Sequence, residues 1–564
     1  MKSLGLRALL AFTLYSLVFS FYCFASVSLT LSQRQLCDLE LLLNGSFAPL
    51  KGFLNQKDYD SVVKDMRLAN GALWPMPIML DVDEATVKKL ATDNELLLKS
   101  PEGFVLARMH VSDAWQPNKT VEAASVYGTI DATHPGVQYL LKQTKDYYVG
   151  GDVTFVNTPE HHDFQELRRS PEQLKQYFKE HNITKIVAFQ TRNPLHRAHQ
   201  ELTMRAAQQS GAHLLLHPVV GLTKPGDVDY FTRVRCYKKL LKYYPKDSVT
   251  LSLLPLSMRM AGPREALWHA LIRQNYGATH FIVGRDHAGP GNDKNGKPFY
   301  GPYDAQELVL KHASELGIEV IPFQEVVYVP SKQAYEPVDK IPQGTETWSI
   351  SGTQLRELLR NGSPIPSWFS YPDVVEELQK TYPPKQQQGF VVFFTGLSGS
   401  GKSTLAEALA IKLNELQHKP ITIFDGDEVR KFLSSELGFS KEHRSLNIRR
   451  IGYVAHHVSK SGGIVLCCPI APYEEDRQAN RKLISSGASY IEVYVSTSLE
   501  ECEKRDVKGL YAKARAGLIK EFTGISDPYE APIKPEIVID TAGISISEGV
   551  CKIITHLRQE GLLV

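Results

Sequence analysis

Apolar positions in the first third of the chain occur in short runs that are separated by Gly, Pro, Asn and Asp. Residues 77–82 and 103–107 are two such runs. Short apolar runs between turn-forming residues predict β-strands. We therefore expect residues 29–165 to form a domain that is rich in β-structure.

From about Arg168 the pattern changes to buried apolar runs that alternate with helical periodicity. Strands are expected at residues 186–189, 214–216, 281–283 and 320–321. Helices are expected between them, at residues 198–209, 263–273 and 305–316. Alternating strands and helices predict a parallel, Rossmann-like sheet, here within residues 166–382.

A polar segment with two prolines, residues 383–389, follows this pattern and predicts a linker. The apolar run at residues 390–394 then opens a second α/β pattern that continues to residue 564. At roughly 100–200 residues per domain, a chain of this length holds several domains. The expected fold class is therefore α/β and multidomain.

Composition and charge restrict the function only weakly. The 43% hydrophobic and 22% charged residues are ordinary for a soluble globular protein, and the net charge of +2 gives no reason to expect nucleic acid as a partner. The seven cysteines include no Cys-x-x-Cys pair, so neither a disulfide framework nor a zinc site is indicated. Scattered cysteines favour a reducing compartment.

The first candidate site is the segment 190–199, Gln-Thr-Arg-Asn-Pro-Leu-His-Arg-Ala-His, which leaves a predicted strand and enters a predicted helix. His196 and His199 are three residues apart and share one helix face. Near a helix N-terminus, beside Arg192 and Arg197, they are expected to meet phosphate oxygens. Two alternatives stay open: metal ligands, although no third ligand is nearby in the sequence, or buried structural histidines.

This segment resembles the ATP sulfurylase family, whose histidine pair is akin to that of other nucleotidylyl transferases. Four more blocks agree in order with that family, and the resemblance extends over residues 31–382. These blocks are residues 34–40, 258–266, 284–291 and 350–356. The resemblance implies a PUA-like N-terminal domain followed by a nucleotidylyltransferase domain of the Rossmann type.

The resemblance also implies roles for individual residues. Sulfate attacks the α-phosphorus of ATP and pyrophosphate leaves, so positioning and positive charge suffice and no covalent nucleophile is required. The catalytic group would be Thr191, Arg192 and Asn193, with Arg192 holding sulfate. The phosphates would be bound by His196 and His199. The nucleotide would be lined by Gln190, Gly284, Arg285, Asp286, His287, Ala288 and Val326.

The second candidate site fits the pattern G-x-x-x-x-G-K-[ST] between a predicted strand and a predicted helix, the context that indicates a phosphate-binding P-loop. Its backbone N–H groups would cradle the phosphates of ATP, Lys402 would reach the β- and γ-phosphates, and Ser403 would ligate Mg²⁺. An incidental glycine-rich helix start is the alternative. The expected ATP-binding residues are Gly396, Leu397, Ser398, Gly399, Ser400, Gly401, Lys402, Ser403 and Thr404.

The blocks after the P-loop resemble the adenylylsulfate kinase family, over residues 390–564. They are residues 425–430, 437–450, 508–515 and 522–530. The resemblance implies that Lys402, Asp425 and Asp427 are catalytic, with one of the two carboxylates accepting the proton of the ribose 3′-hydroxyl or ordering Mg²⁺. The adenylylsulfate-binding residues would be Arg430, Phe439, Arg444, Asn447, Ile470 and Lys508. For Arg449 and Arg450, a solvated helix face is an open alternative.

Two positions depart from the kinase pattern. His443 stands where the family usually has Asp, and Ala471 stands where it usually has Ser. A phosphoserine at position 471 is thereby excluded. The P-loop mechanism does not require that serine, so we expect kinase activity nevertheless.

The function expected from both resemblances is sulfate activation: ATP and sulfate give adenylylsulfate, and a second ATP gives 3′-phosphoadenylylsulfate. Two alternatives stay open, a kinase-like domain that only regulates and a sulfurylase that runs in the ATP-forming direction. The expected cofactors and partners are ATP, Mg²⁺, sulfate and adenylylsulfate, and a homo-oligomer is expected.

The N-terminus conflicts with a cytoplasmic enzyme. Lys2 and Arg7 precede an uncharged stretch that is followed by the small residues Ala25 and Ser26, so residues 1–28 form an apolar leader typical of a secretory signal or a membrane anchor. An atypical or misassigned start is the alternative. We expect a cytoplasmic location, because the rest of the chain requires ATP, and membrane contact only if the leader is a real anchor.

Overall fold

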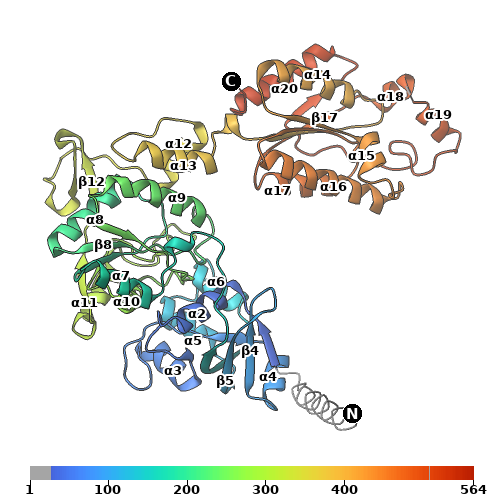
Figure 1. Ribbon diagram of the computed structural model, residues 1–564. Helices are drawn as coiled ribbons and strands as arrows, with labels where there is room; N and C mark the ends of the chain where they lie inside the picture. The colour runs from blue at the N-terminus through green and yellow to red at the C-terminus, as the bar shows by residue number, and fades with distance from the viewer. Residues whose placement is uncertain (1–26, 507, 564) are drawn as a thin grey trace, which may run out of the picture. The chain divides into compact units, whose positions relative to one another are not determined.

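The structure, a computed structural model, describes residues 27–506 and 508–563 (Figure 1). The expected leader lies largely outside the described residues. The chain divides into two compact units, one of residues 1–350 with 366–377 and one of residues 351–365 with 378–564. Each unit is described by itself. No helix of the described part is long and apolar enough to cross a membrane.

The first unit begins with a six-stranded sheet of order β1-β4-β5-β6-β2, in which β3 also pairs with β6. Its strands are β1 (Val27–Thr30), β2 (Gly52–Phe53), β3 (Leu80–Val82), β4 (Glu95–Lys99), β5 (Val105–Trp115) and β6 (Tyr147–Phe155). Five helices, which the analysis of apolar runs missed, accompany it. They are α2 (Gln33–Leu43), α3 (Gln56–Asp65), α4 (Glu84–Leu90), α5 (Lys119–Tyr127) and α6 (Pro135–Lys142).

Local capping signals for these helices are present in the sequence. The Ser32 hydroxyl accepts from the backbone N–H of Gln35, whose side chain returns a bond to the Ser32 N–H. Asn55 and Asn118 each accept a backbone N–H three residues later. Such caps stabilise a helix start by about 1 kcal/mol, enough to define short helices between strands.

The second sheet of the first unit is parallel, with the order β11-β10-β7-β8-β9. Its strands are β7 (Ile186–Phe189), β8 (His213–Leu216), β9 (Val249–Leu251), β10 (His280–Val283) and β11 (Glu319–Pro322). Its helices are α7 (Pro171–Glu180), α8 (Arg197–Ser210), α9 (Tyr230–Leu240), α10 (Gly262–Asn275) and α11 (Asp304–Lys311). The predicted Rossmann-like order is confirmed, and it reverses between β7 and β10, which makes the carboxyl ends of these strands the expected ligand site.

Helix α11 differs from its expected range. It ends at Lys311 rather than at Leu316, and a 3-10 turn, η3 (Ala313–Glu315), follows. The Leu316 N–H bonds to the Ala313 carbonyl, three residues back, so the chain tightens here instead of continuing the helix. A hairpin of β12 (Val326–Val329) and β13 (Ala334–Pro337) comes next. Helix α12 (Gly352–Asn361) belongs to the second unit by its residues, and α13 (Pro372–Thr381), which the division between the units crosses, leads to the linker.

The second unit contains a five-stranded parallel sheet of order β15-β16-β14-β17-β18. Its strands are β14 (Phe390–Thr395), β15 (Ile421–Asp425), β16 (Ile464–Cys468), β17 (Ser489–Val495) and β18 (Ile537–Ile539). Its helices are α14 (Lys402–Leu416), α15 (Gly426–Phe432), α16 (Lys441–Lys460), α17 (Glu474–Ile484), α18 (Leu499–Arg505), α19 (Leu510–Arg515) and α20 (Ile546–Gln559).

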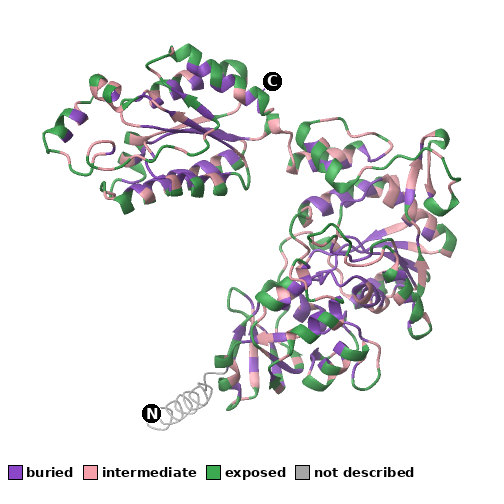
Figure 2. Cartoon of the chain, turned by 180° about the vertical axis from the view of Figure 1, so that it is seen from behind, coloured by how far each residue is buried: buried purple, intermediate pink, exposed green. Residues whose placement is uncertain are grey.

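Strand β14 is buried on both faces, as Figure 2 shows for the sheet of this unit. Phe390, Val392 and Phe394 belong to the apolar cluster formed with α14 and α20, whereas Val391 and Phe393 belong to the cluster formed with α16 and α17. Helices therefore cover both faces of the sheet (Figure 1). Because successive strand residues alternate between faces, this continuous apolar run builds two cores.

Short 3-10 helices connect several of these elements. They are η1 (Gln165–Leu167), η2 (Leu241–Tyr243), η4 (Pro330–Lys332), η5 (Val338–Lys340) and η6 (Lys385–Gln387). The last of these lies in the expected linker, where the Lys385 ammonium donates to the Glu560 carbonyl of the same unit. The expected linker is thus an ordered turn bound to the C-terminal unit.

Candidate active sites

The loops after β7 and β10 meet at the switch point of the first unit. The buried Gln190 follows β7 directly, and its amide donates to the sulfur of Met258 over 3.6 Å. The Thr191 hydroxyl bonds to the backbone of Asn193, donating to its carbonyl and accepting from its N–H, both at 3.1 Å. These contacts make a tight turn. That turn leaves the Arg192 side chain to extend toward the loop after β10.

Arg192 joins the two loops. One of its terminal nitrogens lies 2.5 and 2.6 Å from the carboxylate oxygens of Asp227, and the other donates to the Gly289 carbonyl over 3.3 Å. Both charged side chains are largely buried, with 15% and 7% exposed. The predicted sulfate-binding guanidinium is therefore oriented by a carboxylate that sequence analysis missed. Nothing local marks Asp227 beyond its Gly- and Pro-containing loop.

His196 and His199 both lie at the start of α8. His196 Nδ1 is 2.9 Å from the Ser370 hydroxyl, and the His196 backbone N–H donates to His199 Nδ1 over 3.2 Å. Burial lowers the pKa of His196 to about 3 and that of His199 to about 4, so both rings are neutral near pH 7. Within the described residues, no group of three or more His, Cys, Asp and Glu side chains could hold a metal ion, so the metal-ligand alternative has no third ligand.

The loop after β10 is shaped by left-handed backbone at Asp286 and Ala288, with φ of 51° and 55°. The Ala288 carbonyl accepts from the Gly262 N–H at the start of α10, at 3.2 Å. Arg285 pairs with Glu325 at 3.3 Å, directly before the buried Val326. The Arg285–Glu325 pair therefore brings this loop beside the start of β12.

The P-loop connects β14 to α14. Gly396, Gly399 and Gly401 have φ of 152°, 73° and 100°. A Cβ on Gly401 would meet the Thr541 side chain at 3.1 Å, and one on Gly396 would meet the Val495 carbonyl at 2.5 Å. Positive φ and close packing both favour glycine here. The loop is thus packed against the last residue of β17 and against Thr541, which follows β18.

Lys402 lies over this loop. Its ammonium donates to the carbonyls of Gly396 at 3.0 Å and Leu397 at 2.7 Å, and it lies 3.5 Å from the Ser400 hydroxyl. Burial lowers the pKa of Lys402 to about 8. The carbonyl of Ser398 accepts from the hydroxyl of Tyr511, which lies in the kinase-like block of residues 508–515. Thr404, by contrast, is exposed in the first turn of α14.

Ser403 and Asp425 form the predicted metal-binding corner of the second unit. The Ser403 hydroxyl donates to Asp425 over 2.7 Å. Burial alone would raise the pKa of Asp425, but the Ser403 hydroxyl and the backbone N–H groups of Asp427 and Glu428 outweigh it and lower the pKa. An ionised carboxylate and a hydroxyl are hard oxygen donors of the kind that Mg²⁺ prefers.

The predicted adenylylsulfate residues gather around the turn before α16. Arg430 lies over the Phe439 ring at 4.3 Å and donates to the Gly438 carbonyl, while Phe439 itself is 59% exposed. Arg444 donates to the Phe439 carbonyl at 2.7 Å and pairs with Asp527 at 3.0 Å. This turn therefore combines an accessible aromatic face with two guanidinium groups. Asn447 is buried one helical turn further along, and its side-chain oxygen has no partner among the described residues.

Two more predicted residues lie apart from this turn. Lys508 forms an ion pair with Asp427, and both side chains are exposed. Ile470 precedes the buried Ala471, and its carbonyl accepts from the Thr395 hydroxyl at the end of β14. The structure thus brings the blocks of residues 508–515 and 425–430 together. Ile470 lies beside the P-loop strand rather than in the aromatic turn.

The two departures from the kinase pattern have structural roles here. His443 Nδ1 accepts the Gly438 N–H at 2.9 Å, a bond that an Asp carboxylate could also accept. Ala471 has a left-handed φ of 48°, and its carbonyl accepts from Arg477 at 2.6 Å. His443 therefore keeps the turn before α16 closed. Position 471 contributes its backbone carbonyl, which accepts from Arg477.

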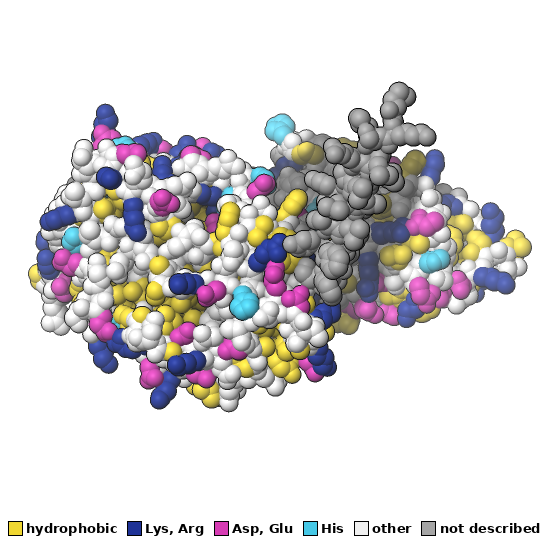
Figure 3. All heavy atoms as spheres, turned by 60° about the horizontal axis from the view of Figure 1, so that its bottom comes forward, with side chains coloured by type: hydrophobic (Ala, Val, Ile, Leu, Met, Phe, Trp, Pro, Cys, Tyr) yellow, Lys and Arg dark blue, Asp and Glu magenta, His cyan; other side chains and the backbone are white. Residues whose placement is uncertain are grey.

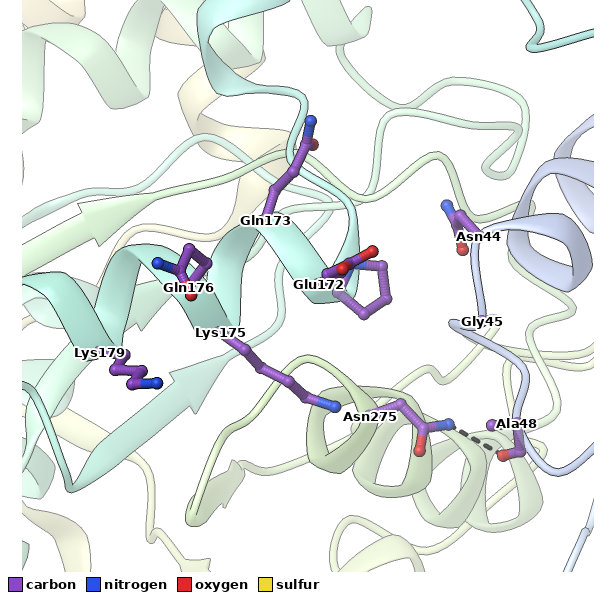
Figure 4. A pocket seen from close by; sticks show the side chains of 10 residues that line it. Asn44, Gly45, Ala48, Glu172, Gln173, Lys175, Gln176, Lys179 and Asn275 are labelled. Carbon is purple, nitrogen blue, oxygen red and sulfur yellow. Dashed lines mark hydrogen bonds between the residues drawn. The ribbon is translucent and has the colours of Figure 1, made fainter.

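Two surface features lie apart from these sites. A groove of about 720 Å³ lies between α7 and the loop that follows α2, where Asn275 donates to the Ala48 carbonyl (Figure 4). Its lining includes Lys175 and Lys179 but none of the predicted nucleotide residues. On the face shown in Figure 3, Lys and Arg side chains are interspersed with Asp and Glu.

Two parallel sheets, each with glycine-containing loops at its carboxyl edge, define an enzyme that transfers groups from nucleotides at two sites. Three family models match the chain: a PUA-like domain at residues 24–158, ATP-sulfurylase at 165–381 and adenylylsulphate kinase at 388–540. The sulfate adenylyltransferases of Chaetomium globosum and Neurospora crassa are 55% and 53% identical, each over 95% of this chain and 94% of the relative.

A solved structure described as a hexameric APS kinase from Thiobacillus denitrificans covers 97% of this chain and 95% of that chain. It has a TM-score of 0.75 and 33% sequence identity. The chain belongs to the sulfate adenylyltransferase family. It is an enzyme with sulfate adenylyltransferase and adenylylsulfate kinase domains, and ATP is a substrate of both.

Proposed function

We propose that this chain performs two consecutive reactions, from sulfate to adenylylsulfate and on to 3′-phosphoadenylylsulfate. The observation that carries the second step is the intact P-loop, in which Lys402 lies over the loop and Ser403 bonds to Asp425. A domain that only bound the product would not require this corner. The fold and the relatives support the first step.

In the first reaction, a sulfate oxygen bonds to the α-phosphorus of ATP while the bond to the leaving pyrophosphate breaks. Arg192, oriented by Asp227, supplies positive charge to the incoming sulfate. His196 and His199 are neutral, so they would act on the phosphates as N–H donors rather than as cations. Orientation and oriented donors supply the rate enhancement, without a covalent intermediate.

In the second reaction, the ribose 3′-hydroxyl of adenylylsulfate bonds to the γ-phosphorus of ATP, ADP leaves, and the hydroxyl proton passes to a carboxylate. Asp425 or Asp427 accepts that proton. Lys402 stabilises the charge that develops on the transferred group. Phe439 offers an accessible face for the adenine, and Arg430 and Arg444 offset the charge of the substrate.

Mg²⁺ would be held by Ser403 and Asp425 together with phosphate oxygens, where it neutralises phosphate charge. Ser403 and Asp425 are already within hydrogen-bonding distance, so no rearrangement of the strand end is required. We therefore assign the metal to this pair in the kinase domain.

We also propose a homo-oligomer in the cytoplasm. A relative with a similar structure is described as hexameric. The six cysteines among the described residues are free thiols, in agreement with a reducing compartment. Analytical ultracentrifugation tests the first proposal, and a monomer would contradict it. Cell fractionation of the full chain beside a chain lacking residues 1–26 tests the second, and recovery of the full chain from membranes or medium would contradict it.

The proposed function is tested by supplying purified protein with ATP and adenylylsulfate. We expect 3′-phosphoadenylylsulfate to accumulate in proportion to ADP. If the product binds tightly but none is made, the second unit is regulatory, and Ala471 and His443 are the positions to revert first, to Ser and Asp. Measuring the sulfurylase in both directions, with and without pyrophosphatase, shows whether adenylylsulfate formation can be sustained.

A further inference from the structure

Three buried polar side chains connect helix α10 to the predicted nucleotide loop after β10. Glu265 and His269 are fully buried on α10, and His287 in the loop is 9% exposed. His269 Nδ1 lies 3.0 Å from His287 Nε2, and His269 Nε2 lies 3.5 Å from a Glu265 oxygen. Neither Glu265 nor His269 belongs to the proposed catalytic or nucleotide-binding set.

The Glu265 carboxylate is fixed at one end of this chain. One oxygen accepts the backbone N–H of Arg259 at 2.8 Å, and the other accepts that of Ala261 at 2.9 Å. Two N–H donors stabilise the ionised form, although burial opposes it. The carboxylate thus presents negative charge to His269 in a site that water does not reach.

Both histidines are neutral, because burial lowers the pKa of each and the fully buried Arg273 lowers both further. A neutral ring carries one N–H, and the partner of one nitrogen decides which nitrogen holds it. The Glu265 oxygen at 3.5 Å is not aligned for a hydrogen bond with His269 Nε2, but its negative charge favours the proton on that nitrogen, so that the lone pair of His269 Nδ1 can accept from His287 Nε2–H. The opposite arrangement would place a lone pair against a carboxylate.

With the protons on His269 Nε2 and His287 Nε2, the His287 Nδ1 atom is a hydrogen-bond acceptor. Among the described residues, the structure gives Nδ1 no partner. The phosphates of ATP carry only acceptors near pH 8, so an N–H or O–H donor must come from the nucleoside. Its donors are the adenine amino group and the ribose hydroxyls. Because His287 keeps 9% of its surface exposed and Nδ1 is not among the fully buried unpaired atoms, water can reach Nδ1 in the free protein, and a donor of the nucleoside would replace that water in the bound state.

We propose that Glu265 and His269 are positioning residues of the sulfurylase, which hold His287 with its proton on Nε2 and present Nδ1 to a donor of the nucleoside. The inference rests on the proposed nucleotide-binding role of the loop that carries His287. It explains why the buried face of α10 carries the polar side chains Glu265 and His269, which packing alone does not explain. Glu265 also ties the same arrangement to the backbone of residues 259–261.

The test compares His269→Leu with His269→Gln. Leucine fills the space without hydrogen bonds, whereas a glutamine amide can donate to Glu265 and accept from His287. We expect the leucine variant to raise the KM for ATP about tenfold with kcat changed less, since one ground-state hydrogen bond is lost. The glutamine variant should remain within about threefold of wild type. Equal effects of both variants on KM would overturn the proposal.

A second measurement reads the protonation of His287 in the wild-type protein. Wild-type protein labelled with ¹⁵N-histidine should show His287, assigned by its loss in His287→Gln, as the neutral form protonated on Nε2 between pH 6 and 8. Protonation on Nδ1, or on both nitrogens, would overturn the proposal. Inosine triphosphate, 2′-deoxyATP and 3′-deoxyATP each lack one candidate donor of the nucleoside. With the analogue that lacks the donor to His287 Nδ1, wild type and His269→Leu should have the same KM, and this identifies the donor.

Failure of the site itself is distinguishable. If Arg192→Ala keeps sulfurylase activity, the proposed location of the reaction is wrong, and the histidine variants test nothing about ATP. If Arg192→Ala is inactive and the histidine variants do not differ, only the positioning role is wrong. The kinase reaction of each variant is the control for intact protein.

Discussion

The hydroxyl of Ser403 donates a hydrogen bond to a carboxylate oxygen of Asp425 over a distance of 2.7 Å. Ser403 lies at the start of α14 and Asp425 at the end of β15, so the bond joins the end of the P-loop to the end of β15. This contact supplies both an oxygen pair for Mg²⁺ and a carboxylate close to the predicted phosphates. It is the contact on which the proposed kinase chemistry depends most.

Ser403→Ala should therefore impair the kinase through its metal. Removing the hydroxyl takes away one oxygen ligand and the only side-chain donor that the structure records for Asp425 among the described residues, so we expect a higher Mg²⁺ requirement and a kcat lower by roughly 10²-fold. The measurement is kinase rate against Mg²⁺ concentration. Ser403→Thr keeps the hydroxyl and is the matched control. Equal behaviour of the two variants would show that the hydroxyl is not a ligand.

The kinase should lose affinity for ATP as the pH rises through about 8. Burial lowers the pKa of Lys402 to about 8 in the free protein, so the ammonium that attracts the phosphates is charged below this pH and neutral above it. We expect kcat/KM for ATP to fall about tenfold per pH unit above 8.

Lys402→Arg is the control for this pH dependence, because a guanidinium stays charged over the same range. Its rate is expected to be lower but flat between pH 7 and 9.5. The sulfurylase rate of the same samples corrects for any general loss of enzyme. A wild-type kinase profile that stays level to pH 9.5 would show that the lysine keeps its charge.

Glu122 should make the first unit less stable as the pH rises. Burial raises its pKa to about 7 in the folded protein, against 4.5 for the free group. The folded state holds this proton more tightly, so the stabilisation is complete below pH 4.5 and is lost as the pH rises through 7. The shift corresponds to about 3 kcal/mol.

Glu122→Gln should remove this dependence and keep the hydrogen bonds, because a single oxygen of Glu122 accepts from both Tyr59 and Tyr148. The measurement is the urea midpoint at pH 5 and pH 8, with loss of sulfurylase activity as the probe. The urea midpoint of the variant minus that of wild type should be larger at pH 8 than at pH 5. The exposed Glu160→Gln is the control and should show no such difference.

Much of the fold followed from the sequence, because strand and helix periodicity are local. The pattern at β7 and α8 and the P-loop before α14 needed only neighbouring residues. The side chains that orient the site residues could not be predicted from the sequence. Ser370, which bonds to His196, is 174 residues away, and Asp227 is 35 residues from Arg192. Such pairs depend on how the loops meet at the sheet edge, which no local pattern encodes.

The helices of the N-terminal domain were missed for a different reason. Their caps, such as Asn55 and Asn118, were present, but short apolar runs between turn residues predict strands and short capped helices equally well. The five helices there are seven to eleven residues long. At that length periodicity alone does not distinguish the two.

The central claim is that one chain carries two separate catalytic sites, and a pair of reciprocal variants tests it most directly. The measurement follows ³⁵S from sulfate, with ATP and pyrophosphatase, and assays each half-reaction alone. Arg192→Ala should abolish adenylylsulfate formation and still convert supplied adenylylsulfate to 3′-phosphoadenylylsulfate. Lys402→Ala should form adenylylsulfate at the wild-type rate and phosphorylate it at least about 10²-fold more slowly. The assignment would be contradicted if either properly folded variant lost both reactions, or if either variant kept both.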